Sequence, residues 1–428
     1  MRRSRAFLAF VHLAGLFIIY RLGADAMADM ACRSGNSLAL KIASFTSPGD
    51  ARVCYNLALK GQYSLKRPEP DRAIGLYRLA VLRDPLYARA WYQMALACRL
   101  SGRHRDAGAA ISRYEELRGT YGQDLWDIGI FRLEDGEEDR AAADFKRCIE
   151  LRPGAVAGVS GLFLLLNTPQ GYMAEKVLPR TSVAYNGYID YLLGSDMADS
   201  ALSFLRFSHG LVGLDRKAAL CRLLLAQGRI DEALDFWRHL PGGGDCGSGP
   251  AMANGGFERP LGKRADACFG WVAQDGPGFT LSYDGSRRTE GKRSLHVRFN
   301  GHRGQGFLLW QYIIVAPARS YELKADIRTK NVVTASGIRL EVWSQACRGY
   351  YARSPQLRGT GRWRELSVAF QAPRGCRLLK AGIARDGPLK LDRTDRSDLW
   401  IDNVRVSACG RFLPCAREKA GMKKAKKP

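Results

Sequence analysis

A small residue that recurs at a fixed interval constrains the fold of this chain more than any other feature. Ala73, Ala107 and Ala141 follow one another at intervals of 34 residues. Large side chains occupy the fourth position after each alanine: Tyr77, Ile111 and Phe145. A small residue lets two helices approach closely, whereas a bulky one would hold them apart. The repeated pattern therefore predicts stacked helix pairs.

The interval, the small and large residues, and the prolines Pro85 and Pro153 that follow two of the units together resemble the tetratricopeptide family. The resemblance implies an α-solenoid, which we place at residues 50–240, with a concave surface that binds protein partners. The segment 66–70 lies between the helices of the first unit and departs from the pattern. After Pro153 the spacing loosens, so the number of repeats stays open. The alternative interpretation is a spacer without a binding role.

Residues 241–252 are rich in glycine and proline, which predicts a flexible linker. Residues 253–408 then consist of short apolar or alternating runs separated by Gly, Pro, Asp and Asn. In the run 321–328 apolar residues alternate strictly with charged ones, so one face of that strand is buried and the other is solvated. This half of the chain is predicted to form an antiparallel β-sandwich.

Short motifs in a fixed order link this half to a known family. Residues 254–258 read Asn-Gly-Gly-Phe-Glu, Gly361 stands two residues before Trp363 ahead of a strand, and residues 401–404 read Ile-Asp-Asn-Val on the last strand. The order resembles the carbohydrate-binding-module type of galactose-binding-like jelly roll. The resemblance implies a sugar ligand. It also implies a structural calcium ion held by Glu258 and Asp402, whose carboxylates suit a hard cation; an exposed Glu and a turn-forming Asp are the alternative.

We predict the ligand face from residue parity along two strands. Trp310 and Tyr312 share one face of their strand, and Arg339, Glu341 and Trp343 share one face of another. Exposed aromatic rings stack on sugar rings, and polar side chains orient the hydroxyl groups. The competing interpretation is that these aromatic side chains belong to the core, as most aromatic residues on strands do.

The N-terminus predicts a targeting segment at residues 1–29. Basic residues at positions 2, 3 and 5 precede the apolar run 6–22, so this end would stay in the cytoplasm while the rest crosses. The run fits an uncleaved signal anchor in a bacterial-type inner membrane, with the bulk of the chain in the periplasm. It also fits a signal peptide cleaved after Ala24-Asp25-Ala26. A third interpretation is a core helix of a cytosolic protein.

Charge and cysteines add two constraints. Residues 246–428 carry 34 Lys and Arg against 15 Asp and Glu, a field that attracts anionic partners such as an acidic glycan. The end of the chain, 409–428, is predicted to be a basic tail. None of the 11 cysteines forms a CxxC pair, and the later ones are candidates for disulfides in an exported domain. Cys98, Cys148 and Cys221 fall at helical packing positions, where we expect small buried hydrophobic residues.

No catalytic motif appears: the six histidines stand beside no GxSxG or HExxH sequence. We therefore expect no enzyme and no cofactor beyond the calcium ion. The preferred hypothesis is an envelope scaffold whose repeats bind protein and whose sandwich binds glycan, in surface polysaccharide assembly or export. The alternative is a purely structural assembly platform. Nucleic acid is not an expected partner, because no aromatic–basic motif of the known kinds occurs.

Overall fold

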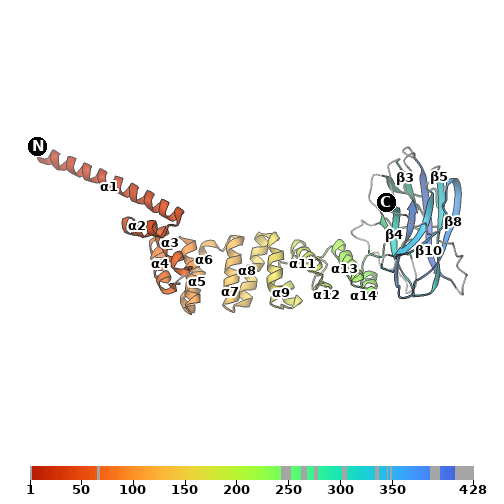
Figure 1. The fold of residues 1–428 in the computed structure, drawn as a ribbon, viewed down its shortest axis with the longest axis horizontal. Coiled ribbons are helices and arrows are strands. Elements are labelled where there is room, and N and C mark those ends of the chain that lie inside the picture. Colours follow the sequence, from red (N-terminus) through yellow and green to blue (C-terminus); the bar gives the residue numbers. More distant parts are fainter. Residues whose placement is uncertain are drawn as a thin grey trace, which may run out of the picture. The chain divides into compact units, whose positions relative to one another are not determined.

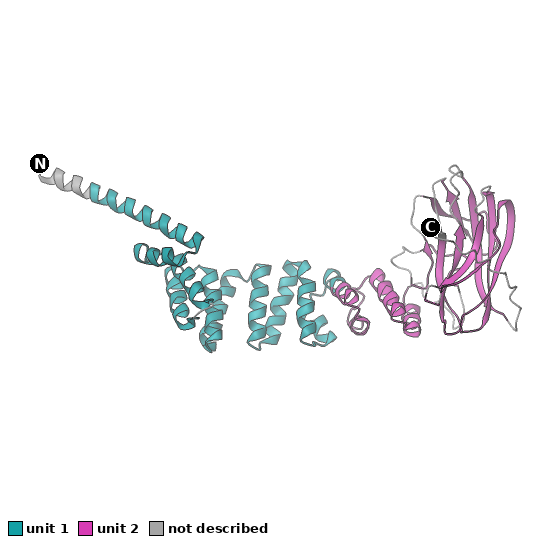
Figure 2. Cartoon of the chain, in the orientation of Figure 1, with its two compact units in different colours: residues 1–187 teal, residues 188–428 magenta. Residues whose placement is uncertain are grey.

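The computed structural model describes residues 2–64, 68–241, 252–261, 268–273, 278–300, 306–332, 337–344, 346–347, 349–385 and 396–409. The chain divides into two compact units, residues 1–187 and 188–428, which are described separately (Figure 2). Most of the predicted linker and all but the first residue of the predicted basic tail lie outside the described residues.

The first unit is helical (Figure 1). Its elements are α1 (Arg2–Ser34), α2 (Ser37–Thr46), α3 (Ala51–Gln62), α4 (Pro70–Arg83), α5 (Ala88–Leu100), α6 (His104–Arg118), α7 (Gly122–Glu134), α8 (Glu138–Leu151), η1 (Pro153–Ala155), α9 (Val156–Leu165), α10 (Gln170–Tyr172) and η2 (Met173–Val177). Helices α3 and α4, α5 and α6, and α7 and α8 pack in pairs. Gly102 and Gly136, in the tight turns inside two of these pairs, adopt φ of +70° and +80°, a conformation that suits glycine.

The alanine register sets the packing of the pairs. Ala73, Ala107 and Ala141 are fully buried, as are Tyr77 and Phe145. Position 129 is also small where two helices approach closely. A β-carbon on Gly129 of α7 would come within 2.8 Å of the Phe145 ring of α8. The predicted α-solenoid is therefore confirmed in the first unit.

Helix α1 runs without a break through the segment predicted to be an anchor or signal. Its second half packs through Ala28 and Ala31 against Leu40 and Ala43 of α2 and against Val53 of α3. Among the residues that the structure describes, no helix combines the length and the apolarity needed to cross a membrane. The predicted membrane helix thus finds no support there.

The second unit opens with four helices: α11 (Ser182–Gly194), which spans the division, α12 (Ala198–Leu205), α13 (Leu214–Ala226) and α14 (Ile230–Arg238). A disulfide joins Cys221 of α13 to Cys268, which precedes the first strand. Asp231 of α14 accepts two hydrogen bonds from the Arg377 guanidinium, at 2.6 and 2.9 Å. The expectation for Cys221 is therefore wrong in part: it is buried, but it is cross-linked, whereas Cys98 and Cys148 are buried free thiols.

In the described part of the second unit, two antiparallel five-stranded sheets follow. The strands are β1 (Val272–Ala273), β2 (Phe279–Asp284), β3 (Ser294–Phe299), β4 (Gly306–Ile314), β5 (Ser320–Val332), β6 (Ile338–Ser344), β7 (Tyr350–Arg353), β8 (Gly359–Gln371), β9 (Leu378–Arg385) and β10 (Asp398–Ala408). One sheet, here called sheet A, has the order β1-β4-β9-β6-β7, and the other, sheet B, has the order β2-β3-β10-β5-β8. Neighbouring strands are mostly far apart in sequence, as in a jelly roll.

Alternation along the strands builds the core between the sheets. Leu309, Leu340 and Ile383 of sheet A and Leu323 and Ile401 of sheet B are all fully buried in one hydrophobic cluster. A second disulfide, Cys347–Cys376, ties the loop after β6 to the segment before β9. The β-sandwich prediction is confirmed, and the opposite parity positions of sheet A lie on its outer face.

Candidate binding surfaces

The ladder of sheet A places the predicted ligand residues in two adjacent rows on its outer face. In one row Tyr312 of β4 and Trp343 of β6 both pair with Lys380 of β9. In the next row Trp310 and Glu341 both pair with Gly382. Two rows on one sheet face bring together side chains that are more than 30 residues apart in sequence.

Three aromatic rings of these rows surround one ammonium group. The Lys380 Nζ lies 4.3 Å from the Trp310 ring centroid, 5.4 Å from that of Tyr312 and 5.8 Å from that of Trp343. The Trp310 ring meets the rings of Tyr312 and Trp343 edge-on, at 5.2 and 6.0 Å. All three aromatic side chains are half-buried. Cation–π attraction holds Lys380 in the cluster, so the predicted aromatic residues converge around a positive charge.

Gly382 makes room for this cluster. A β-carbon there would lie 2.8 Å from Cβ of Trp310 and would also collide with the Leu309 carbonyl oxygen. A side chain at this position would push β4 away from β9. The glycine thus allows the two strands to pair closely beside Trp310.

Arg339 and Glu341 are placed differently from the aromatic residues. They form a salt bridge and are only 7% and 3% exposed. The Tyr351 hydroxyl of β7 also donates to Glu341 Oε1. Burial, and next the hydrogen bond to Glu341, raise the pKa of Tyr351. The Arg339 guanidinium and the Tyr351 hydroxyl both donate to Glu341 Oε1, which holds β6 against β7 at this edge of the sheet. Arg339 and Glu341 therefore stabilise the sheet.

Helix α13 covers part of the aromatic face. Between them lies a pocket of about 360 Å³ whose walls come from both elements. Arg222, Leu225 and Ala226 line it from the helix, and Tyr312, Trp343, Ser344, Ala346, Leu378, Leu379 and Lys380 line it from the sandwich. Burial raises the pKa of Tyr312, and the positive charge of Arg222 opposes that shift.

The two predicted calcium ligands meet at one loop. Asp402 is fully buried, and its Oδ2 accepts hydrogen bonds from the backbone N–H of Thr289 at 2.7 Å and of Glu290 at 3.2 Å. The Thr289 hydroxyl donates to the same oxygen at 3.0 Å. Glu258 Oε1 accepts the Lys292 N–H at 2.8 Å. Both carboxylates therefore anchor the loop between β2 and β3.

This donor set fits a cation poorly. Each N–H that points at a carboxylate oxygen carries a partial positive charge, which repels a metal ion at the same oxygen. Within the described ranges, no group of three or more His, Cys, Asp or Glu side chains is arranged to hold a metal. Calcium at Glu258 and Asp402 thus stays a prediction, and the mechanism that the geometry supports is loop anchoring by hydrogen bonds.

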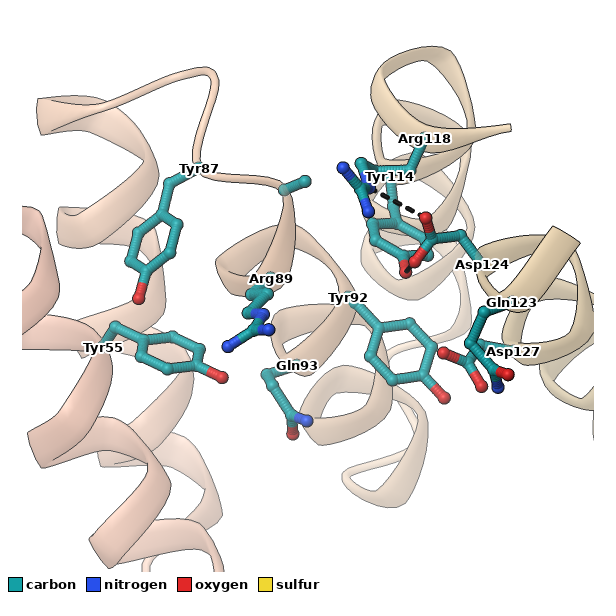
Figure 3. A pocket seen from close by; sticks show the side chains of 11 residues that line it. Tyr55, Tyr87, Arg89, Tyr92, Gln93, Tyr114, Arg118, Gln123, Asp124 and Asp127 are labelled. Carbon is teal, nitrogen blue, oxygen red and sulfur yellow. Dashed lines mark hydrogen bonds and ion pairs between the residues drawn. The ribbon is translucent and has the colours of Figure 1, made fainter. Parts of the chain in front are cut away.

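A second surface lies in the first unit, as a groove of about 600 Å³ across helices α3, α5, α6 and α7 (Figure 3). It is lined by Tyr55, Tyr87, Ala88, Arg89, Tyr92, Gln93, Tyr114, Arg118, Gln123, Asp124 and Asp127. The rings of Tyr55 and Tyr87 are 5.0 Å apart at one end, and those of Tyr92 and Tyr114 are 5.0 Å apart at the other. Four tyrosines give the groove amphipathic walls, with apolar rings and polar hydroxyl groups.

Charges of both signs stand in this groove. Asp124 is neutralised by Arg118, whose Nε donates to it at 2.8 Å, and Tyr114 donates to its other oxygen at 2.6 Å. Asp127 lies beside Tyr92 (Figure 3). Burial, and then the charge of Asp124, raise the pKa of Asp127. Burial, followed by the charges of Asp127 and Glu134, raises the pKa of Tyr92 to about 12. A cation near Asp127 would relieve this accumulation of negative charge.

None of the groove residues was predicted from the sequence as a binding residue, although the 34-residue interval of the repeats also applies to them. Tyr55, Arg89 and Gln123 are spaced by the same 34 residues as the alanines, and so are Gln93 and Asp127. Positions that recur in this way on the first helix of each pair face one side of an α-solenoid. Extending the register from the packing positions to the polar ones would have found them.

The fold defines a protein with two parts: an α-solenoid of helix pairs and a β-sandwich of two antiparallel sheets. Solved structures similar to parts of the chain include MamA, 19% identical over 43% of this chain and 87% of that one, with a TM-score of 0.26. The Pseudomonas aeruginosa protein pilF is 16% identical over 50% of this chain and 90% of its own, with a TM-score of 0.29.

A carbohydrate-binding module of family 4 is 12% identical over 37% of this chain and 99% of its own, with a TM-score of 0.28. No protein-family model matches the sequence, and no curated protein matches it. Similarities at this level show nothing about a ligand or a partner of this chain.

Proposed function

We propose that this protein is a non-catalytic scaffold that binds an extended segment of a partner protein in the groove of its helical unit. The observation that carries the proposal is the groove of about 600 Å³, with tyrosines at both ends and charges between them. Tyrosine rings provide contact area at low entropic cost, and their hydroxyl groups can bond a peptide backbone. A basic side chain of the peptide would lie between Tyr92 and Asp127, and an acidic one would face Arg89.

The test is selection of binding peptides by phage display on the full-length chain. Selected peptides are then titrated by fluorescence anisotropy against Tyr92→Ala, Asp127→Asn and Leu82→Ala. Leu82 is 76% exposed and lies outside the groove, so it controls for a general effect of substitution. We expect the first two variants to weaken binding at least about tenfold, as hot-spot side chains do. Peptides that bind all variants equally, or the absence of any selected peptide, would contradict the proposal.

A second activity, glycan binding by the sandwich, is supported by the convergence of Trp310, Tyr312 and Trp343 on the outer face of sheet A. A glycan array probed with the full chain tests it, with Trp343→Ala as the variant. Trp363→Ala, on β8 of the other sheet, is the matched control. Saturable binding to a defined sugar that only Trp343→Ala abolishes would support the activity. If no sugar binds, the sandwich is a structural element and the chain is an assembly platform for proteins alone.

We further propose that the protein works outside the cytoplasm, in the assembly or export of a surface polysaccharide. Two disulfides, Cys221–Cys268 and Cys347–Cys376, support an oxidising compartment. The basic excess of residues 246–428 supports an anionic partner for the sandwich. Labelling of free thiols with and without a reductant, on protein isolated from cells, tests the compartment. The four cysteines of these two disulfides are expected to become reactive only after reduction; their full reactivity without reductant would contradict it.

A further inference from the structure

Negative charge gathers on one wall of the groove in the helical unit, and most of it is neutralised by arginines of this chain. Asp124 pairs with Arg118 at 2.8 Å. Glu134, whose charge reaches the same wall, pairs with Arg99. Asp127 differs from both, because it forms no ion pair with any residue that the structure describes. The groove therefore contains a carboxylate that lacks a counter-charge among the described residues.

The immediate surroundings of Asp127 explain why its charge is left in place. Asp127 is half-buried, and its carboxylate accepts a hydrogen bond from the uncharged amide of Gln123. The Oε1 atom of the same amide accepts a hydrogen bond from the Arg152 guanidinium at 2.5 Å. Gln123 thus stands between the guanidinium and the carboxylate. Burial, and then the charge of Asp124, raise the pKa of Asp127, whereas an adjacent cation would lower it.

Two tyrosine rings lie next to this carboxylate. Tyr92 stands beside Asp127, and the rings of Tyr92 and Tyr114 pack together at 5.0 Å (Figure 3). The Tyr114 hydroxyl donates to Asp124 at 2.6 Å, which fixes that ring. Tyr114 is buried and Tyr92 is half-buried, so Tyr114 supports the Tyr92 ring from behind while Tyr92 keeps exposed surface in the groove. An accessible aromatic ring beside a carboxylate attracts a cation through both groups.

We propose that Asp127 and Tyr92 form a pocket for an arginine side chain of the partner segment. The inference rests on the proposed function and names the residue that the groove selects. A guanidinium can donate two parallel hydrogen bonds to the Asp127 carboxylate while its flat face lies against the Tyr92 ring. Gln123 uses one of the roughly four acceptor positions of the carboxylate, which leaves positions for both of these bonds.

Arginine suits this pocket better than lysine or a neutral side chain. An ammonium group is more strongly hydrated than a guanidinium, so it loses more hydration on entering a half-buried site. It also contacts the carboxylate as a point charge and has no flat face to lay on the Tyr92 ring. A neutral side chain would bury Asp127 further without a counter-charge, which is costly. Asp127 is therefore a specificity-determining residue of the groove.

The first test is peptide selection from a fully random display library, at moderate salt so that surface charges are screened. It is run on three full-length proteins: the wild type, Asp127→Asn and Glu150→Gln. Glu150 is an exposed residue of α8 that does not line the groove, and its substitution removes the same charge. We expect arginine to be enriched at one peptide position with the wild type and with Glu150→Gln, and not with Asp127→Asn.

The second test changes the peptide instead of the protein, so it does not depend on how a variant folds. One peptide selected by the wild type is synthesised with arginine, lysine or citrulline at the enriched position and titrated by fluorescence anisotropy. Citrulline has the shape of arginine without its charge. We expect citrulline to weaken binding to the wild type by about 10- to 100-fold, the equivalent of one charge-assisted pair, and lysine to fall between the two. The arginine and citrulline peptides should bind alike to Asp127→Asn.

The outcomes separate this inference from the proposed function. Selected peptides without an enriched arginine, or an arginine preference that Asp127→Asn retains, would overturn the inference and leave peptide binding in the groove standing. Equal binding of the arginine and citrulline peptides to the wild type would do the same. A lysine peptide that binds as tightly as the arginine peptide would overturn the guanidinium assignment. If none of the three proteins selects a peptide, the proposed function itself fails, and the inference fails with it.

Discussion

The ring of Phe145 lies directly against Gly129, so that a β-carbon at position 129 would come within 2.8 Å of the ring's Cζ. The two residues belong to α7 and α8, the helices of the third pair. Phe145 cannot easily give way, because it is fully buried and meets Trp126 and Phe163 edge-on at 5.4 and 5.6 Å. This contact is the reason for a small residue at position 129.

Gly129→Val should destabilise the helical unit by about 1–3 kcal/mol, the cost of overpacking a filled core. Gly108→Val is the matched control: it also lies within a helix, and a β-carbon there meets no atom within 4 Å. Urea unfolding followed by circular dichroism at 222 nm measures both. Combining Gly129→Val with Phe145→Leu should recover part of the loss. A loss of the same size at position 108 would show that the Phe145 contact is not the cause.

Glu341→Gln should destabilise the sandwich strongly, because it leaves the Arg339 guanidinium buried beside an uncharged partner. Removal of one member of a buried ion pair costs about 3–5 kcal/mol. The double variant Arg339→Met with Glu341→Leu should regain most of the lost stability, since no uncompensated charge then remains. Guanidinium-induced unfolding, followed by tryptophan fluorescence, measures the free energy of unfolding of the wild type and of both variants. A loss below about 1 kcal/mol, typical of surface pairs, would contradict burial of the pair.

Asp402→Asn should lower the melting temperature by the same amount in calcium and in EDTA. The Asp402 carboxylate accepts backbone N–H groups of Thr289 and Glu290, and the amide that replaces it offers only one acceptor oxygen. The cost of lost charge-assisted bonds is about 1–3 kcal/mol. Differential scanning calorimetry of both proteins measures the shifts. A wild-type melting temperature that falls when EDTA is added, and does not fall in the variant, would instead support the calcium prediction.

Asp284 should make the sandwich sensitive to acid. Burial alone would raise its pKa, but hydrogen bonds from Ser286, Trp400 and Arg287 outweigh burial and hold the pKa well below its usual range. A lowered folded-state pKa contributes stability that is complete above the unfolded value of about 3.9 and is lost as the pH falls below it. The advantage of the wild type over Asp284→Asn should therefore be large at pH 6 and shrink toward pH 2.5. Chemical unfolding at both pH values measures it; an advantage independent of pH would contradict this assignment.

Local periodicity was enough to predict both kinds of secondary structure. The spacing of Ala73, Ala107 and Ala141 predicts helix pairs because a helix that packs on one side must repeat its small residues in register. Successive side chains on a strand point to opposite faces of the sheet. The sequence therefore predicts that Trp310 and Tyr312 share one face, and that Arg339 and Trp343 share one face. The same 34-residue interval, applied to polar positions as well as to the alanines, also predicts groove residues such as Tyr55, Arg89 and Gln123.

Patterns within single segments therefore predict the helix pairs, the sandwich and the face on which each strand residue lies, since these depend on neighbours a few residues away. Long-range packing places β9 between β4 and β6, which brings Lys380 among three aromatic rings. It also pairs Cys221 with Cys268, lays α13 over part of the aromatic face, and lets Asp402 anchor the loop at Thr289. These contacts join residues from 37 to 113 positions apart. They arise when sheets and helices pack together, and no repeating pattern within either partner specifies which distant segment it will meet.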